Sequence, residues 1–310
     1  MGILPAARVT TNPEYVKGLH LRKMSLHWAD RLLFCGCLLA GSMSMQAENG
    51  DAVSGVEACL QQLGAQPTSS GALPGQFRLV SWNIEKGNDS QWVDDLLKAP
   101  RPLDLILLQE AYQPSVFGDL LMPGVHERFS EGFLAKDLQT GVLSVSRVAP
   151  DLHCTLTAYE PWLGTPKATS VTRYGIGTAA QQLLVINTHS VNFEWGLDSY
   201  NSQLEALSRL LAAHSGPAIL AGDFNTWSRE RLAALLATTQ ANGLDPVGFT
   251  PDQRTRAFGF PLDHIFIRGL VTTDSGTLSV STSDHNPVWA ALSLAESSPA
   301  PNRDANNLDK

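Results

Sequence analysis

The stretch AILAGDFN, residues 218–225, joins a run of aliphatic residues to a carboxylate and an amide, Asp223 and Asn225. The aliphatic part has the length and composition of a buried strand. Because Gly, Asp and Asn are turn formers, a strand that simply ends in a turn explains this stretch when it is taken alone. The alternative is a rigid strand end that aims two oxygen ligands at a divalent cation and a phosphate.

Short apolar runs of the same kind recur along the chain, and turn residues bound most of them. They are FRLVSWNIE (77–85), LDLILLQE (103–110), GVLSVSR (141–147), LLVINTHS (183–190), LDHIFIRG (262–269) and TLSVSTSDHN (277–286). Helical patterns occupy residues 90–99, 198–216 and 229–243. Strands alternate with helices early in the chain, whereas later strands follow one another through loops. This order predicts an α/β fold in which two mixed sheets stack and helices flank them.

Polar residues lie at or just beyond the ends of these runs. They are Asn83, Glu85, Glu110, His189, Asn192, Asp223, Asn225, Asp263, Asp284 and His285. Each one alone has an ordinary structural explanation, such as a solvated strand end, a buried histidine, an Asx turn or a salt bridge. Together they form the pattern expected where sheet edges converge on one polar pocket. The sequence therefore favours a functional site over a set of unrelated turns.

Six motifs, in chain order, resemble those of the endonuclease/exonuclease/phosphatase family. They are SWNIEKG (81–87), LILLQE (105–110), NTHSVN (187–192), GDFN (222–225), LDHIFI (262–267) and SDHNP (283–287). Longer stretches are similar to a bacterial branch of that family, the YafD-like proteins: EPWLGTPKATSV (160–171), HSVNFEWGLDSY (189–200), GDFNTWSR (222–229) and DQRTRAFGFPLD (252–263). The resemblance implies a four-layer α/β sandwich and metal-dependent cleavage of phosphate esters, and it leaves the ester open.

The resemblance also implies a metal site. Glu110 resembles the principal metal-binding carboxylate of the family, and Asn83 and Glu85 on the neighbouring strand would help to hold the ion. Asp284 stands where the family has a further acidic ligand of the metal or its water. Because hard carboxylate and amide oxygens suit small divalent cations, the expected cofactor is Mg²⁺ or Mn²⁺.

Further positions match catalytic residues of the family. Asp223 and Asn225 resemble the pair that orients the nucleophile and the phosphate. His285 resembles the histidine that contacts the scissile phosphate, and Asp263 resembles the carboxylate that orients this histidine. His189 occupies a position that holds histidine or tyrosine across the family. An imidazolium held by a carboxylate can donate a proton to the phosphate oxygens or to the leaving group.

The charge of the chain limits how it can bind a substrate. The formal net charge is -8, and residues 1–47 are themselves net basic. No broad basic surface is therefore expected for long nucleic acid, and phosphate contacts must be local. Candidate contacts are Arg147, Lys167, Arg254, Arg256 and, by resemblance, the amide of Asn192. Four aromatic residues lie near the motif ends: Trp162, Trp195, Trp227 and Phe258. Each would stack on a base, cover a lipid glycerol or simply pack within its loop.

These features predict a metal-dependent phosphodiesterase of the nuclease type that acts on short or single-stranded nucleic acid or on a small phosphodiester. A phosphatase or phospholipase-like hydrolase of a small or lipid phosphate is the alternative among hydrolases. A non-catalytic binding module tethered to a membrane is the alternative of another class. Since no feature of the sequence indicates an obligate protein partner, we expect a monomer.

Composition divides the chain into four segments. We expect a folded unit over residues 76–295, after a flexible lead-in over 48–75 and before a disordered tail over 296–310. The resemblance implies that this unit is the endonuclease/exonuclease/phosphatase-like domain. In residues 1–47, basic residues precede the short apolar run LLFCGCLLAG (32–41), as in a signal or membrane-tethering leader. With such a leader the chain is exported or tethered to the inner membrane; otherwise it is cytoplasmic. Cys59 and Cys154 could pair after export and would stay reduced in the cytoplasm.

Overall fold

The structure is a computed structural model that describes residues 53–68, 71–112, 124–135, 138–177 and 181–295. These residues belong to the unit that spans 48–310. The predicted leader, 1–47, and the predicted tail, 296–310, lie outside the described residues. No helix within the described ranges is both long and apolar enough to cross a membrane.

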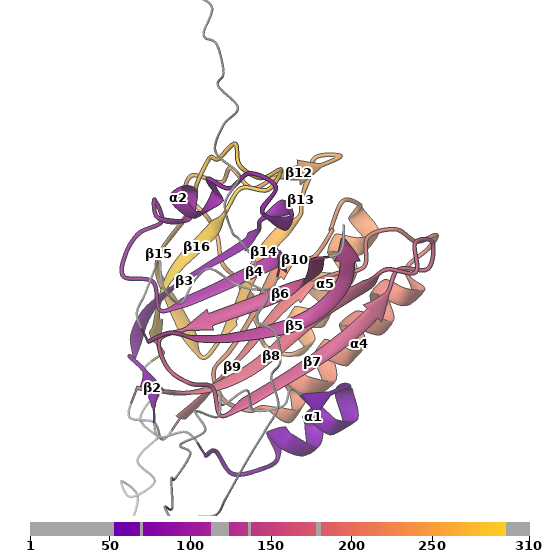
Figure 1. Cartoon of the computed structure of the whole chain (residues 1–310). Coiled ribbons are helices and arrows are strands. Elements are labelled where there is room, and N and C mark those ends of the chain that lie inside the picture. Colours follow the sequence, from indigo (N-terminus) through magenta and orange to yellow (C-terminus); the bar gives the residue numbers. More distant parts are fainter. Residues whose placement is uncertain (1–52, 69–70, 113–123, 136–137, 178–180, 296–310) are drawn as a thin grey trace, which may run out of the picture. The chain divides into compact units, whose positions relative to one another are not determined.

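The first of two large sheets is mixed (Figure 1). Its strands are, in spatial order, β1 (Val53–Ser54), β7 (Leu152–Tyr159), β8 (Pro166–Ile176), β9 (Gln181–His189), β10 (Ala218–Asp223), β14 (Asp263–Arg268) and β11 (Asp245–Pro246). The short strand β2 (Ala72–Leu73) pairs with β8 beside this path. Because β10 is parallel to β9 and antiparallel to β14, the ends of β9 and β10 and the beginning of β14 share one edge of the sheet.

The second large sheet is also mixed. Its strands are, in spatial order, β15 (Leu270–Thr277), β16 (Val288–Leu294), β3 (Gln76–Asn83), β4 (Leu105–Tyr112), β6 (Leu138–Ser146) and β5 (His126–Ala135). Strands β3 and β4 are parallel, so their carboxyl ends also meet at one edge. A separate small hairpin joins β12 (Arg256–Ala257) to β13 (Phe260–Pro261).

The two sheets pack face to face on an apolar core. In β10, Ile219 and Ala221 contribute to this core, whereas Ala218 and Leu220 contribute to a second core on the opposite face of the same sheet. Successive side chains of a strand point to opposite faces. The run is therefore apolar throughout because both faces of β10 are buried.

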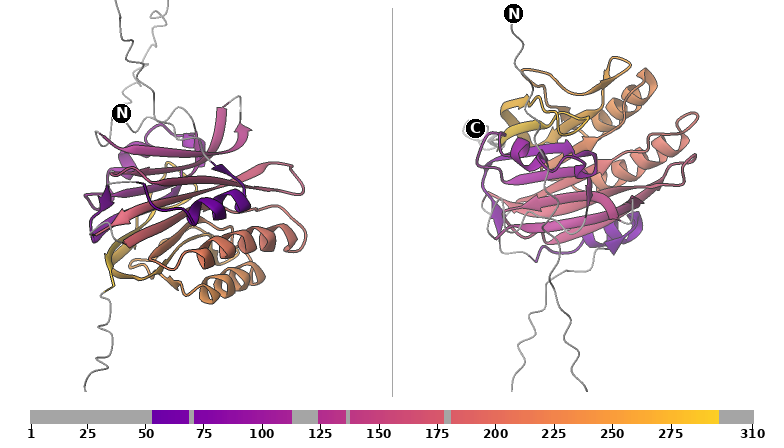
Figure 2. Two further views of the ribbon diagram at one scale, coloured as in Figure 1. Left: turned by 90° about the horizontal axis from the view of Figure 1, so that it is seen from below. Right: turned by 45° about the horizontal axis from the view of Figure 1, so that its top comes forward.

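Helices cover the outer faces of both sheets (Figures 1 and 2). Helices α1 (Val56–Leu63), α4 (Asp198–Ala213) and α5 (Arg229–Ala241) pack on the first sheet, and α2 (Trp92–Leu96) packs on the second. In the described part of the chain the layers are helix, sheet, sheet and helix. The predicted four-layer α/β sandwich is therefore confirmed.

A polar link crosses the apolar interior between the sheets. Gln109 on β4 donates from Nε2 to Oδ1 of Asn187 on β9 at 2.7 Å. Asn187 Nδ2 in turn donates to the carbonyls of Leu108 and Leu143 at 3.2 and 3.1 Å. Both amides are fully buried, and a buried amide that loses its partner costs about 1–3 kcal/mol. The link therefore favours one alignment of the two sheets.

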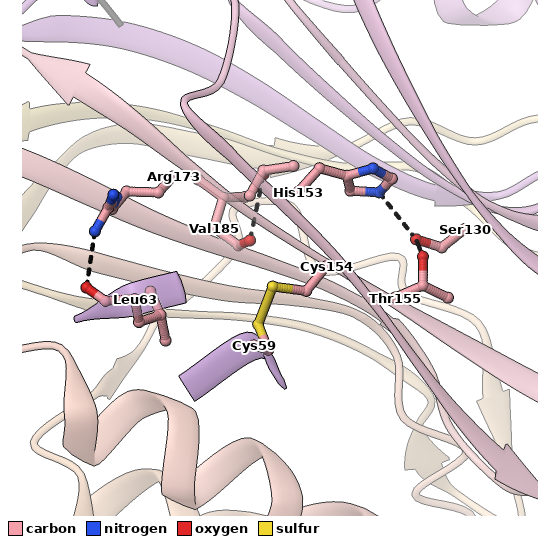
Figure 3. Close-up of a disulfide and its surroundings, with 9 residues drawn as sticks. Cys59, Leu63, Ser130, His153, Cys154, Thr155, Arg173 and Val185 are labelled. Carbon is pink, nitrogen blue, oxygen red and sulfur yellow. Dashed lines mark hydrogen bonds between the residues drawn. A yellow bond between two sulfur atoms is a disulfide. The ribbon is translucent and has the colours of Figure 1, made fainter. Parts of the chain in front are cut away.

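The prediction of a flexible lead-in over 48–75 is wrong for the residues that the structure describes. A disulfide joins Cys59 of α1 to Cys154 of β7, with their Cα atoms 5.7 Å apart (Figure 3). At the end of the helix, Arg173 donates to the carbonyl of Leu63 at 2.9 Å. The composition is misleading because linker-like residues follow a short helix whose apolar side is covered by the sheet. The two cysteines are paired, which is one of the two states that the sequence left open.

The prediction of a strand over 277–286 is also wrong. Residues 278–287 form a loop, and β16 begins only after it. The side chain of Asn286 accepts from the backbone N–H of Val280 at 3.1 Å, which closes the loop on itself. Leu278 and Val280 pack, partly buried, on the outer face of the second sheet. Their apolar character therefore reflects loop packing and not a strand.

Candidate active site

Polar side chains of the first sheet lie side by side at one edge. Asp223, the last residue of β10, is in register with His189 on β9 and with Asp263 on β14. All three are buried. Asp263 begins its strand, although the sequence pattern placed it near the end of a run, and it reaches the same edge because β14 is antiparallel to β10. The structure brings these three predicted residues together.

The second sheet contributes Asn83 and Glu110 from β3 and β4. Asn83 is in register with Gln109, so Glu110 follows one residue further along the neighbouring strand. Asn83 Nδ2 donates to Asp223 Oδ2 at 3.1 Å, and Asn83 Oδ1 accepts from the N–H of Glu85 at 3.1 Å. The site therefore belongs to both sheets.

His285 lies in the loop before β16, and its imidazole reaches the edge of the first sheet. His285 Nδ1 donates to Asp263 Oδ2 at 2.8 Å, and its Nε2 lies 3.8 Å from Asp223 Oδ2. The indole of Trp82 donates to the carbonyl of His285 at 2.8 Å and so holds the loop. The predicted contact between Asp263 and His285, which are 22 residues apart, is confirmed.

The charges of these groups depend on one another. Burial would lower the pKa of His285, but the carboxylates of Asp263 and Asp223 raise it to about 10. Burial raises the pKa of Asp223, although the charge of His285 opposes this effect. The imidazole therefore keeps its second proton at neutral pH, and both of its nitrogens are hydrogen-bond donors.

His189 is electrically neutral and interacts with a buried lysine. Lys167 Nζ lies 3.0 Å from His189 Nε2 and 3.5 Å from Glu160 Oε1. Burial, together with the positive charge of Lys167, lowers the pKa of His189 well below its ordinary value. His189 therefore accepts from Lys167 through Nε2 and carries its proton on Nδ1. The structure thus brings Lys167 to the site, as the sequence predicts, and Glu160 beside it was missed.

Glu110 is half-buried at an irregularity of β4. The pairing of β4 with β6 shifts register between Leu108 and Ala111. The ammonium of Lys86 pairs with Glu110 Oε2, and His189 Nε2 lies 3.9 Å from Oε1. Sequence reasoning missed Lys86, although it stands inside the motif SWNIEKG.

Several of these residues have a left-handed backbone. The φ angles of Glu85, Glu110 and Asn225 are 48°, 50° and 49°, a region that is costly for residues other than glycine and that recurs at functional sites. Gly222 has a φ of 143°, and a Cβ at this position would lie 1.9 Å from the carbonyl oxygen of Thr188. Glycine therefore allows β10 to approach β9 closely next to Asp223.

Among the described residues, two groups of side chains offer ligands for a divalent cation. The first is the predicted set of oxygen donors on β3 and β4 and just beyond β3: Asn83, Glu85 and Glu110. The second places three ligand atoms within 4.8 Å of one another, from Asp223, Asp263 and His285. In the second group a metal ion would have to displace the proton that the carboxylates of Asp263 and Asp223 hold on the imidazole of His285, whereas the hard oxygens of the first group suit Mg²⁺ or Mn²⁺.

The prediction that Arg147 contacts a substrate at this site is wrong. Arg147 follows Ser146, which pairs with Leu105 at the beginning of β4, the end of that strand opposite to Glu110. Its Nε donates to the carbonyl of Leu103 at 2.8 Å. The error arose because β6 is antiparallel to β4, so the end of the run GVLSVSR points away from the site.

Other predicted residues lie in loops at the rim. Arg256 donates to Asp252 Oδ2 and to the carbonyl of Gly259, both at 3.1 Å, which ties its own hairpin together. Asp284 is exposed, and its backbone N–H donates to a carboxylate oxygen of Glu85 at 3.2 Å. The roles of Arg256 and Asp284 toward a substrate or a metal stay predictions.

Arg231, near the beginning of α5, was missed by the sequence analysis. Its buried guanidinium donates to the carbonyls of Val191, Asn225 and Asn192 at 2.7, 3.2 and 3.0 Å. The guanidinium also lies 4.4 Å from the centre of the Tyr200 ring. It therefore joins the loops that follow β9 and β10. Nothing in the sequence distinguishes it from an exposed arginine in the first turn of a helix.

Comparison with known proteins agrees with this arrangement. The model of the Endonuclease/Exonuclease/phosphatase family matches residues 80–285. A UPF0294 protein of Vibrio parahaemolyticus is 37% identical over 239 residues, which cover 76% of this chain and 83% of the relative. Relatives with this name correspond to the YafD-like branch that the motifs indicated.

Solved structures share the fold at lower identity. The catalytic domain of human Nocturnin, solved with a bound sulfate anion, has a TM-score of 0.54 at 15% identity and covers 73% of this chain and 97% of that chain. A mannosyl-6-phosphatase of Bacteroides thetaiotaomicron has a TM-score of 0.52 at 18% identity, and the match covers 70% of this chain and 99% of that chain. With the family match and the site geometry, these findings show that the chain belongs to the endonuclease/exonuclease/phosphatase family of hydrolytic enzymes.

Proposed function

We propose that this chain is a phosphodiesterase that depends on a divalent metal ion. The observation that carries the proposal is the buried pair of Asp263 and His285, joined at 2.8 Å. Asp223 lies beside this pair. His189 lies between Asp223 and Glu110 of the second sheet, because its Nε2 is near the carboxylates of both. This combination suits hydrolysis of a phosphate ester, because the charge of the phosphate must be balanced while a water molecule is activated.

The metal ion would be held by Glu110 with Asn83 and Glu85. Asp284, which is exposed at the rim, is a candidate ligand of the ion or of its water. A bound divalent cation would neutralise charge on the phosphate oxygens and lower the pKa of a bound water. Glu110 suits this role because its carboxylate is half-buried and already faces a cationic group, the ammonium of Lys86.

Other residues would act on the nucleophile and the phosphate. Asp223 Oδ2 lies 3.5 Å from His189 Nε2 and 3.8 Å from His285 Nε2, which suits a carboxylate that orients the attacking water. His285 would donate from Nε2 to a phosphate oxygen or to the leaving group, while Asp263 fixes the ring. Asn225 would bind the phosphate through its amide, beside Asp223 Oδ1, which accepts from the N–H of Asn225 at 2.9 Å.

The charges of the site do not by themselves separate a diester from a monoester. The carboxylates of Glu110, Asp223 and Asp263 are accompanied by the ammonium groups of Lys86 and Lys167 and by the protonated imidazole of His285. The monoester therefore stays the alternative, and turnover of the two kinds of ester distinguishes them. The nuclease-like action on short or single-stranded nucleic acid stays a prediction, and the net charge of -8 disfavours tight binding of long duplexes.

A direct test measures turnover of bis(p-nitrophenyl) phosphate and p-nitrophenyl phosphate with Mg²⁺, with Mn²⁺ and with EDTA. We expect hydrolysis of the diester with either metal, loss of this activity in EDTA and recovery when metal is restored. Full activity in EDTA would contradict the proposal. Faster turnover of the monoester would favour the phosphatase alternative, and no turnover of either ester with any metal would favour a non-catalytic binding module.

A further inference from the structure

A cavity of about 450 Å³ opens beside the candidate active site. Its wall is mostly apolar and includes Trp162, Phe193, Trp195, Trp227, Phe258 and Leu262. These side chains come from separate loops: the one between β7 and β8, those after β9 and β10, and the hairpin before β14. Such a volume and lining are typical of a small-molecule site.

The wall of the cavity includes residues next to the candidate catalytic residues. Asn225 and Leu262 belong to its wall, and they lie two residues after Asp223 and one residue before Asp263. The backbone joins them, since the N–H of Phe224 donates to the carbonyl of Leu262 at 2.9 Å. A phosphate bound at Asp223 would therefore have one of its ester groups next to this wall.

Three of the ten residues of the wall are polar, and the protein already uses part of their hydrogen-bonding capacity. Asn192 Oδ1 accepts from the indole of Trp227 at 2.9 Å, and Asn225 Nδ2 donates to the carbonyl of Ser190 at 3.0 Å. The carboxylate of Glu194 accepts from the first turn of α4, including the N–H of Tyr200 at 2.8 Å. Most of the wall therefore offers no partner to the polar edge of a nucleobase, whose lost hydrogen bonds to water cost binding energy. An apolar group has no such hydrogen bonds to lose.

Aromatic side chains of the wall are unusually exposed. Trp195 and Phe258 are 84% and 87% exposed. Each lies beside a second ring: the centres of Trp195 and Trp162 are 5.0 Å apart, and those of Phe258 and Trp227 are 6.3 Å apart. Contiguous apolar surface of this kind marks a binding site more often than an ordinary loop surface.

We propose that this cavity binds a large apolar group, alkyl or aryl, that is esterified to the phosphate of the substrate. The inference rests on the proposed phosphodiesterase function and names its substrate class. It replaces a nucleoside as the expected ester group. Both alkyl chains and aryl rings would bury apolar area against the same wall.

The test uses glycerol phosphodiesters whose second ester group is methyl, octyl, phenyl or thymidine. Mass spectrometry counts cleavage of either phosphate ester bond, below the concentration at which the octyl ester forms micelles. We expect kcat/KM of the octyl or the phenyl ester to exceed that of the methyl ester by about tenfold or more. A higher value for octyl indicates a lipid chain, and a higher value for phenyl indicates an aryl group. A thymidine ester that is cleaved faster than both would overturn the proposal.

Variants connect this preference to the cavity. The double variant Trp195→Ala and Phe258→Ala should remove most of the advantage in kcat/KM that the octyl or phenyl ester has over the methyl ester. The control is Val271→Ala, which removes an exposed apolar side chain from β15 at the other end of the second sheet. An unchanged preference in the double variant would overturn the proposal.

A binding measurement separates this proposal from the phosphodiesterase function. Calorimetric titration with octyl phosphate, phenyl phosphate and methyl phosphate requires no turnover. Tighter binding of the apolar esters to the wild-type protein than to the double variant would support the cavity even if no diester is cleaved. Equal binding of all three phosphates would overturn it even if diesters are cleaved.

Discussion

Glu110 is the residue whose replacement tests the metal site most directly. Glu110→Gln keeps the shape of the side chain but removes the charge that would hold a divalent cation. We expect loss of metal-supported turnover and of calorimetric Mn²⁺ binding, with little change in melting temperature. Glu131→Gln, an exposed residue of β5, is the matched control and should change none of these quantities. Full Mn²⁺ binding by Glu110→Gln would contradict the assignment.

Asp263 should act through His285. Asp263→Asn removes the negative charge that keeps the imidazole of His285 protonated. It also places an amide, which can donate a hydrogen bond, where a carboxylate now accepts from His285 Nδ1 at 2.8 Å. We expect kcat to fall about 100-fold or more while KM changes little. The control Asp274→Asn alters an exposed carboxylate on β15. Steady-state kinetics would refute the coupling if both variants behaved like the wild-type protein.

Residue types at strand ends could be predicted from the sequence, because the chemistry of phosphate and metal binding restricts them to a few side chains. The partners of those residues could not. Lys86, just after β3, pairs with Glu110 on β4. Glu160, just after β7, approaches Lys167 on β8. Both contacts exist only because neighbouring segments of the fold meet. Arg147 shows the converse, since a substrate contact was predicted from its charge and position, but β6 runs antiparallel to β4 and ends far from Glu110.

At the scale of elements, Arg231 joins α5 to the loops after β9 and β10. Arg231→Met keeps the apolar stem but leaves the buried carboxylate of Glu194, 3.5 Å from the guanidinium, without its charge partner. Removing one partner of a buried ion pair costs about 3–5 kcal/mol, so we expect the free energy of unfolding to fall by about that amount. Arg229→Met, an exposed neighbour on the same helix, should stay within about 0.5 kcal/mol of the wild-type protein in denaturant titrations.

His264 should make the first sheet sensitive to acid. Burial, with the charge of Arg254, lowers the pKa of His264 from 6.5 to about 3. Arg254 donates to its Nδ1 at 3.3 Å, and its Nε2 lies 2.8 Å from the hydroxyl of Thr226 and 3.2 Å from the carbonyl of Pro261. Between pH 6.5 and about 3 the unfolded chain binds a proton that the folded chain excludes. Stability is therefore full above pH 6.5 and falls as the pH is lowered through this window.

The measurement compares the wild-type protein with His264→Gln in denaturant unfolding at pH 7, 6 and 5. The free energy of unfolding of the wild-type protein should fall more steeply, by up to about 1.4 kcal/mol per pH unit relative to the variant. His153, whose pKa is lowered to about 4 by burial and by Arg128, titrates in both proteins and cancels from the difference. Parallel pH profiles would rule out this role of His264.

Elements with one strong periodicity were predictable, and elements fixed by tertiary contacts were not. Helix α4 repeats apolar residues on one face, and its span was predicted within a few residues. Helix α1 is short, and the sheet, the disulfide and Arg173 hold it in place. The loop over 278–287 alternates apolar and polar residues at its start, as a strand does. The side chain of Asn286 accepts a backbone hydrogen bond within the loop instead.

At the scale of the whole molecule, the disulfide closes a long loop. Cys59 and Cys154 are 95 residues apart, and a cross-link of this span restricts the unfolded chain. The double variant Cys59→Ala and Cys154→Ala should therefore lower the free energy of unfolding by about 2–4 kcal/mol. Wild-type protein unfolded in the presence of a thiol reductant should approach the same value. Equal stability with and without reductant would show that the cross-link contributes nothing.

The buried amides of Gln109 and Asn187 also bear on how this enzyme could change its substrate. Apolar packing between sheets is non-directional and would tolerate sliding, and a slide of one residue moves a strand by about 3.3 Å. Such a shift would separate Asn83 from Asp223, which now meet at 3.1 Å. The amide pair opposes the shift because its hydrogen bonds form in one alignment. Rim loops could therefore be exchanged, in evolution or by design, without misaligning the candidate active-site residues, provided that these two amides are retained.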